Sequence, residues 1–166
     1  MPTTRSGSPL AFDLVCNTGP ILALGKMGVL DALPSLGLSM VFPSAVAEEL
    51  DAGIRLGFSI SRPDWIPVVD QSASPAFEAS LDRGEAAVLQ LALALDVKTV
   101  CIDEWRGRRA ALAIGLQVVG SLGLLGRMVR SGTVNDPRQI LHKAVLAGVR
   151  YHPELLGRFL TALSID

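Results

Sequence analysis

Cysteine and histidine are scarce in this chain, which has two of each among 166 residues. Cys16 and Cys101 are isolated within apolar runs, and this setting favours buried thiols over a disulfide or a reactive nucleophile. His142 and His152 lack metal-ligand spacing and lie near no pair of carboxylates in the sequence. We therefore expect neither a disulfide-stapled fold nor a histidine-centred catalytic site.

Long apolar runs are also missing. No segment reaches the roughly 18 uninterrupted apolar residues of a membrane-spanning helix, and the longest candidate, residues 86–97, contains Gln90 and Asp96. The first 14 residues hold one arginine but neither a long apolar run nor a small-residue cleavage site, so a signal peptide is not predicted. We expect a cytoplasmic protein.

The chain has no excess of charge, since its net charge is −1. The field of the whole molecule therefore attracts RNA or DNA only weakly, and local charge must do so. A tight group of three arginines is the best candidate for phosphate contacts, with a solvated helix face as the equally weighted alternative. The group consists of Arg106, Arg108 and Arg109. Aromatic residues are few, at five Phe, two Trp and one Tyr, so the sequence does not predict a surface on which nucleobases stack.

Apolar residues are abundant, at 49 % of the chain with a mean hydropathy of +0.42. A chain of this length buries roughly 70 % of the surface that its unfolded form exposes, so one core is sufficient. The apolar surplus is expected to meet a partner. We predict a flexible lead over residues 1–10 and a single domain over residues 11–166.

Short β-favouring runs alternate with helical patterns along the chain. The predicted strands cover residues 12–16, 39–42, 65–70, 97–102 and 116–120. The third of these contains Pro67 and is therefore expected to be an edge strand of the sheet or no strand at all. Helices are predicted between the strands and after Pro137 and Pro153. This alternation predicts a parallel sheet covered by helices on both faces.

Four short segments each place an oxygen-bearing side chain where a strand ends or a helix begins. These side chains are Asn17, Glu49, Glu85 and Asp103. The carboxyl ends of parallel strands meet at one crevice, so residues far apart in the sequence come together there. Converging carboxylates repel each other unless a cation lies among them, and hard oxygen ligands suit Mg²⁺ or Mn²⁺. The pattern predicts a metal-dependent enzyme acting on phosphoryl groups.

Each of the four positions also has a purely structural interpretation. Asn17 is a good N-cap for the helix that follows it. Asp82 and Glu85 have the spacing of a capping box. Glu49 lies late in a short helix beside Glu48, so either glutamate can be the solvated one. An N-cap role is the alternative for Asp103 as well.

The order and spacing of four longer segments resemble those of PIN-domain proteins, in particular the VapC-like branch that is often paired with an antitoxin. The segments are NTGPILALGKMGVLDALP (17–34), FPSAVAEEL (42–50), LDRGEAAVLQLALAL (81–95) and IDEWRGRRAALAIGLQVVGSLGLLGRMVRSG (102–132). The resemblance covers roughly residues 12–132. It implies a three-layer α/β/α sandwich with a mostly parallel sheet, a Mg²⁺- or Mn²⁺-dependent endoribonuclease, a homodimer, and inhibition by a cognate antitoxin.

The resemblance also assigns roles to single residues. Asn17 stands where the family most often has its first metal-binding aspartate. The other three acidic positions are matched by Glu49, Glu85 and Asp103. Thr18 matches a small hydroxyl residue beside the first acid, and Ser121 matches a polar residue near the floor of the site. An asparagine at the first position supplies a carbonyl oxygen to a cation but no negative charge.

These observations lead to a hypothesis of metal-dependent RNA hydrolysis, in which Glu49, Glu85 and Asp103 are catalytic. Together with Asn17 they would bind one or two divalent ions. The arginine group would position the RNA backbone. Two alternatives remain: a catalytically weak or inactive PIN-like binding module, favoured by Asn17, and a receiver-like or mononucleotide-binding domain. The second lacks support because no glycine-rich phosphate loop occurs.

Overall fold

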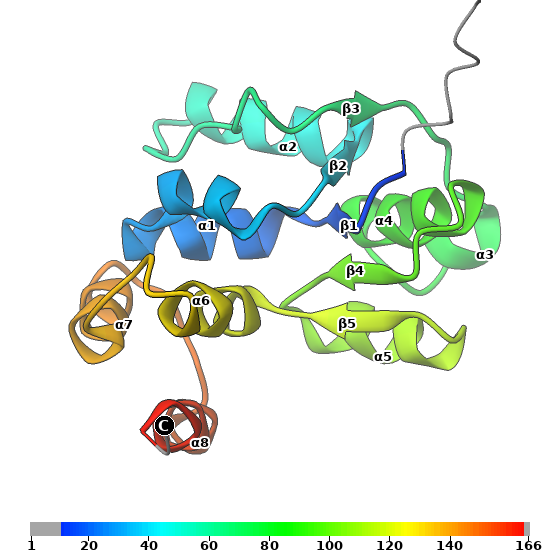
Figure 1. The fold of residues 1–166 in the computed structure, drawn as a ribbon. Helices are drawn as coiled ribbons and strands as arrows, with labels where there is room; N and C mark the ends of the chain where they lie inside the picture. The colour runs from blue at the N-terminus through cyan, green and yellow to red at the C-terminus, as the bar shows by residue number, and fades with distance from the viewer. Residues whose placement is uncertain (1–10, 165–166) are drawn as a thin grey trace, which may run out of the picture.

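The computed structural model describes residues 11–164 of the chain (Figure 1). The predicted flexible lead over residues 1–10 lies outside the described residues.

Five short strands form one parallel sheet in the order β3-β2-β1-β4-β5 (Figure 1). They are β1 (Leu14–Cys16), β2 (Met40–Pro43), β3 (Val68–Val69), β4 (Thr99–Cys101) and β5 (Gln117–Val119). Val15 in the central strand is aligned with Val41 on one side and Val100 on the other. Residues of β1 and β2 are buried throughout, because helices cover the sheet.

Helices follow or precede every strand. They are α1 (Thr18–Met27), the 3₁₀ helix η1 (Leu30–Leu36), α2 (Ser44–Arg55), α3 (Pro75–Glu78), α4 (Arg83–Ala94), α5 (Trp105–Ala113), α6 (Ser121–Arg130), α7 (Pro137–Leu146) and α8 (Pro153–Leu163). Within residues 11–164, no helix has the length and apolar character needed to cross a membrane.

The helices form layers on both faces of the sheet, which confirms the predicted α/β/α arrangement. On one face α4 packs along β1, β2 and β4, and α5 packs beside it on β5. On the other face α1 contacts η1, α6 and α7, and α6 contacts α8. Helix α2 packs against β2 and β3 and also contacts α4.

The two cysteines lie at the centre of this core. Cys16 and Cys101 are register partners on β1 and β4, both are 0 % exposed, and both thiols are free. The neighbouring Cys16 thiol and burial raise the pKa of the Cys101 thiol well above its ordinary value. Both residues are therefore buried free thiols, as their apolar surroundings in the sequence predicted.

Two elements differ from their sequence-based expectation. Proline is common at the first position of a helix, so Pro20 indicates a start there, but helix α1 begins two residues earlier, at Thr18. Asn17 directly precedes its first turn. A proline interrupts a regular α-helix, so Pro34 indicates a break, but the 3₁₀ helix η1 contains it and continues to Leu36. The edge position predicted for residues 65–70 is confirmed by β3, which is only two residues long.

The strand order brings several chain segments to one crevice. The chain extends from β1 to β2 and β3 on one side, and later to β4 and β5 on the other. The order therefore reverses beside β1, and such a reversal leaves a crevice at the carboxyl ends of the strands. Asn17 follows β1 and Asp103 follows β4 at this edge. The first turn of α4 lies at the same edge, because Gly84 is close to the Asn17 side chain.

Candidate active site

An open pocket of about 590 Å³ lies at the carboxyl ends of β1 and β4, and we call it the acidic pocket. Four of its lining residues are carboxylates, which come from α2, from the start of α4 and from the start of α5. Its lining consists of Asn17, Thr18, Gly19, Leu22, Glu49, Asp82, Glu85, Glu104, Trp105 and Arg106.

Asn17 occupies the N-cap position of α1 but does not cap it with its side chain. Its backbone is extended (φ −89°, ψ 169°) and its side chain makes no capping hydrogen bond. Its backbone N–H donates to the Cys101 carbonyl at 3.0 Å, which fixes the residue against β4. The residue is 5 % exposed, and its carboxamide lines the acidic pocket. The capping interpretation alone therefore does not explain this asparagine.

Glu49, and not Glu48, belongs to the pocket. The Thr18 hydroxyl donates a hydrogen bond of 2.9 Å to Glu49 Oε2, which joins α1 to α2 at the pocket wall. Glu48 instead forms an ion pair of 2.7 Å with Arg83. Glu49 is therefore the glutamate of this pair that lines the acidic pocket, and its contact partner Thr18 is the residue to which the resemblance assigns a supporting role.

Three oxygen atoms converge beside Gly84 in the first turn of α4. A Cβ atom added to Gly84 would lie 3.1 Å from Glu49 Oε2, 3.2 Å from Asn17 Oδ1 and 3.5 Å from Asp82 Oδ1. All three oxygens are therefore near a single point, and they can approach it because residue 84 has no side chain. Two of the three belong to carboxylates, so their mutual repulsion favours a bound cation.

Glu85 caps α4 and lines the pocket at the same time. The Asp82 carboxylate accepts from the Glu85 backbone N–H at 2.7 Å, and Glu85 Oε2 accepts from the Asp82 N–H at 3.3 Å. Burial raises the pKa of the Glu85 carboxyl, and the charges of Asp82 and Glu104 add to that rise. Backbone hydrogen bonds from Asp82 and Gly107 act in the opposite direction. The capping box is thus present, and its glutamate still faces the crevice.

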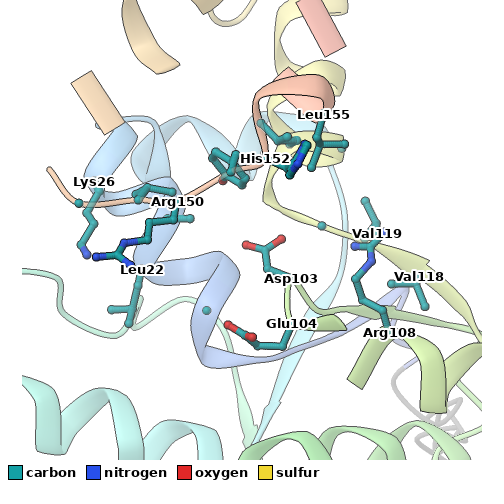
Figure 2. Close-up of a pocket in the computed structure, with 18 residues that line it drawn as sticks. Leu22, Lys26, Asp103, Glu104, Arg108, Val118, Val119, Arg150, His152 and Leu155 are labelled. Atoms are coloured by element: carbon teal, nitrogen blue, oxygen red, sulfur yellow. The ribbon is translucent and has the colours of Figure 1, made fainter. Parts of the chain in front are cut away.

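Asp103 faces a neighbouring pocket. Both of its carboxylate oxygens accept hydrogen bonds of 2.7 Å from Ser121, one from the backbone N–H and one from the hydroxyl. The Ser121 hydroxyl also contacts the Tyr151 hydroxyl. Asp103 and Glu104 line this second pocket, which has a volume of about 800 Å³ and which we call the adjoining pocket (Figure 2). Glu104 lines both pockets and so lies at their boundary.

The three candidate arginines have different positions. Arg106 lines the acidic pocket. Arg108 lines the adjoining pocket and donates from Nη1 to the Ile102 carbonyl at 2.8 Å. Arg109 is exposed on α5 and lines neither pocket.

Sequence reasoning missed several residues that face the two pockets. Asp82 was interpreted only as a cap, although its carboxylate also lies beside Gly84. Trp105, an aromatic side chain that is 71 % exposed, lines the acidic pocket. His152 lines the adjoining pocket. The acidic DE pair at 103–104 and the tryptophan next to it were the available signals for Glu104 and Trp105.

The oxygen donors of the acidic pocket fit a hard divalent cation. Between residues 11 and 164, no three Asp, Glu, His or Cys side chains lie close enough to hold a metal ion by themselves. Mg²⁺ nevertheless keeps several water ligands and is commonly bound through only one or two carboxylates. Glu49 and Asp82 with the amide oxygen of Asn17 supply a set of this kind.

Comparison with known proteins agrees with this architecture. No curated protein and no solved structure matches the chain. The sequence does match the family DUF3368, described as a PIN domain, over residues 13–164. PIN domains are generally nucleases that use divalent metals, which supports a nuclease-type function. With the match covering nearly the whole chain, the protein belongs to the PIN domain family.

Proposed function

We propose that this protein is a divalent-cation-dependent endoribonuclease and that Mg²⁺ or Mn²⁺ binds in the acidic pocket. The observation that carries the proposal is the convergence of Glu49 Oε2, Asn17 Oδ1 and Asp82 Oδ1 beside Gly84. An oxygen-only site with two carboxylates and one neutral donor leaves coordination positions for water and for phosphate oxygens. Glu85 and Asp103, at the same edge of the sheet, complete the proposed acidic set.

The bound cation would orient a water molecule, lower its pKa and neutralise the charge that develops on the phosphate. The side chains of the protein position the reacting groups. Thr18 holds the Glu49 carboxylate through its 2.9 Å hydrogen bond, and Ser121 holds Asp103 through two. Arg106 binds the phosphate backbone from the wall of the pocket. Trp105 offers an exposed ring on which a base next to the cleaved bond stacks.

The biological role we propose is that of the toxin in a toxin–antitoxin pair. The order of the four segments, which resembles that of VapC-like proteins, supports this role. A cognate antitoxin protein would cover apolar surface and inhibit cleavage, and two copies of the chain would form a homodimer in the cytoplasm. The exposed apolar side chains, which include Leu56 at 78 % and Leu146 at 76 %, are consistent with such contacts.

Cleavage of a labelled single-stranded RNA tests the proposed activity. We expect cleavage with Mg²⁺ or Mn²⁺ and none with EDTA, and Glu49→Gln should lose it because a metal ligand becomes neutral. Glu48→Gln is the matched control, since Glu48 lies on the same helix but pairs with Arg83. Equal cleavage by the parent and Glu49→Gln, or cleavage that persists in EDTA, would contradict the proposal.

Asn17 favours one other function, a binding module that holds RNA without cutting it. An asparagine at the first acidic position lowers the negative charge of the pocket and with it the affinity for the cation. The same assay distinguishes the two functions. A parent protein that binds but does not cleave, together with an Asn17→Asp variant that does cleave, identifies the binding module.

A further inference from the structure

We infer that the adjoining pocket binds the nucleotide next to the cleaved bond, with its phosphate held by Lys26 and Arg150. This inference rests on the proposed ribonuclease function, because it extends the path of the same RNA strand.

The position of the pocket supports this role. The adjoining pocket and the acidic pocket share Gly19, Leu22 and Glu104 in their walls. A strand whose phosphate enters the acidic pocket therefore reaches the adjoining pocket with its next unit. The volume of about 800 Å³ lies within the range of pockets that hold small ligands, and a nucleotide is a ligand of that size.

The charges in the pocket suit a phosphate. Lys26 comes from the last turn of α1, Arg108 from α5, and Arg150 from the segment between α7 and α8. Figure 2 shows Lys26 and Arg150 on one side of the pocket and Arg108 on the opposite side, with Asp103 and Glu104 between them. Over residues 11–164 the ion pairs involve only other basic residues, namely Arg62, Arg83 and Lys98. Lys26 and Arg150, which lie on the same side of the pocket, therefore form no ion pair within the described residues, and a phosphate can pair with both.

The remaining walls suit a nucleoside. Leu22, Val118 and Leu155 form apolar surface, while His152 and Tyr151 supply rings for contact with a base. His152 is fixed in place because its Nδ1 accepts a hydrogen bond of 3.3 Å from the Glu154 backbone N–H at the start of α8. Flat rings beside basic groups are how proteins recognise unpaired nucleotides, so the expected ligand is single-stranded RNA.

The adjoining pocket is also connected to the acidic residues by hydrogen bonds. The Tyr151 hydroxyl contacts the Ser121 hydroxyl, and Ser121 holds both oxygens of Asp103. A nucleotide that contacts Tyr151 therefore lies against the group that positions Asp103. Binding in this pocket would place the strand in register with the acidic side chains.

RNA binding in EDTA tests the inference, because it does not depend on cleavage. The probe is a fluorescein-labelled single-stranded RNA of mixed sequence, and the measured quantity is its Kd by fluorescence anisotropy at several salt concentrations. We expect the double variant Lys26→Ala/Arg150→Ala to raise the Kd at least about tenfold. The salt dependence should weaken by about 0.7 units of log Kd per log unit of salt, the contribution of one neutralised phosphate on a single strand. Arg138→Ala/Arg158→Ala removes the same charge from α7 and α8 outside the pocket and should bind like the parent.

A double variant that is folded by circular dichroism and binds RNA as tightly as the parent would overturn the inference, and so would a parent that does not bind the probe. Failure of the proposed function gives a different result. If the parent does not cleave RNA with Mn²⁺ but its RNA binding still depends on Lys26 and Arg150, the result supports the nucleotide pocket and contradicts the proposed nuclease activity. If the parent cleaves RNA but substitution of Lys26 and Arg150 leaves RNA binding unchanged, the nuclease activity is supported and the assignment of the nucleotide pocket is wrong.

Discussion

At the scale of single residues, the side chains of the site combine a structural contact with exposure to a pocket. Glu85 closes the capping box of α4 and also lines the acidic pocket. Asp103 accepts two hydrogen bonds from Ser121 and lines the adjoining pocket. A structural role and a functional role were treated as alternatives for such residues on the basis of sequence, yet the geometry allows both. Substitutions that keep the structural contact are therefore the informative ones.

The first prediction concerns Asp103→Asn. The asparagine keeps a carbonyl oxygen for the Ser121 backbone N–H, and its amide group can donate to the Ser121 hydroxyl, which is able to accept. We expect a folded protein whose RNA cleavage falls by about 10- to 100-fold, because the negative charge is lost. Single-turnover cleavage and thermal melting should be measured together. Unchanged cleavage by a folded variant would show that Asp103 is not a catalytic residue.

The second prediction concerns the pH dependence of stability through Glu85. Because its pKa is raised in the folded protein, its contribution to the free energy of unfolding is complete below the ordinary glutamate pKa and declines as the pH rises through the raised value. Glu85→Gln removes this titration and still accepts the Asp82 N–H. Without metal, the stability of the variant relative to the parent should rise as the pH increases from below to above the ordinary glutamate pKa. Urea unfolding across that range should be compared, and a difference that does not change with pH would contradict the assignment.

At the scale of elements, the sequence predicts which strands and helices exist better than it predicts where their side chains point. The alternation of β-branched runs with Ala- and Leu-rich runs identified the five strands, of which β1 and β2 are buried throughout. The spacing of Asp82 and Glu85 identified the start of α4. The division of Asp103 and Glu85 between two pockets was not predictable. It depends on the Ser121 contact, which links residues 18 positions apart.

The first turn of α4 provides the third prediction. In Gly84→Ala the new Cβ would lie 3.1 Å from Glu49 Oε2 and 3.2 Å from Asn17 Oδ1, so both side chains must move. Alanine has the higher helix propensity, but we expect this crowding to offset the gain in the free energy of unfolding. We also expect Mn²⁺ binding to weaken about tenfold, because the Glu49 and Asn17 side chains are displaced. Equilibrium unfolding and Mn²⁺ titration of the same sample check both effects.

Gly157→Ala is the matched control for that substitution. Gly157 lies inside α8, and a Cβ there would meet no atom within 4 Å. Alanine should therefore stabilise the fold by about 0.5–1 kcal/mol and leave Mn²⁺ binding unchanged. If Gly84→Ala behaves like Gly157→Ala in both measurements, the close packing at Gly84 is not what holds Glu49 and Asn17 in place.

At the scale of the whole molecule, the apolar surplus of the sequence is present at the surface. Leu56, Phe58 and Leu146 are 78 %, 62 % and 76 % exposed. We predict that the chain forms a homodimer, whose two-fold interface covers part of this surface. Light scattering after size exclusion should give twice the 17.5 kDa mass of one chain at micromolar concentrations. The mass of a single chain at every concentration would contradict the prediction.

The central claim is that Asn17, Glu49 and their neighbours bind a divalent cation, and Mn²⁺ titration followed by electron paramagnetic resonance tests it most directly. Free Mn²⁺ gives a signal that is lost on binding, so the titration yields a Kd for the parent and each variant. We expect Asn17→Asp to tighten binding and Glu49→Gln to weaken it, each by about 10- to 100-fold, while Glu48→Gln matches the parent. The same Kd in all four proteins would show that the cation does not bind in the acidic pocket and would contradict the account.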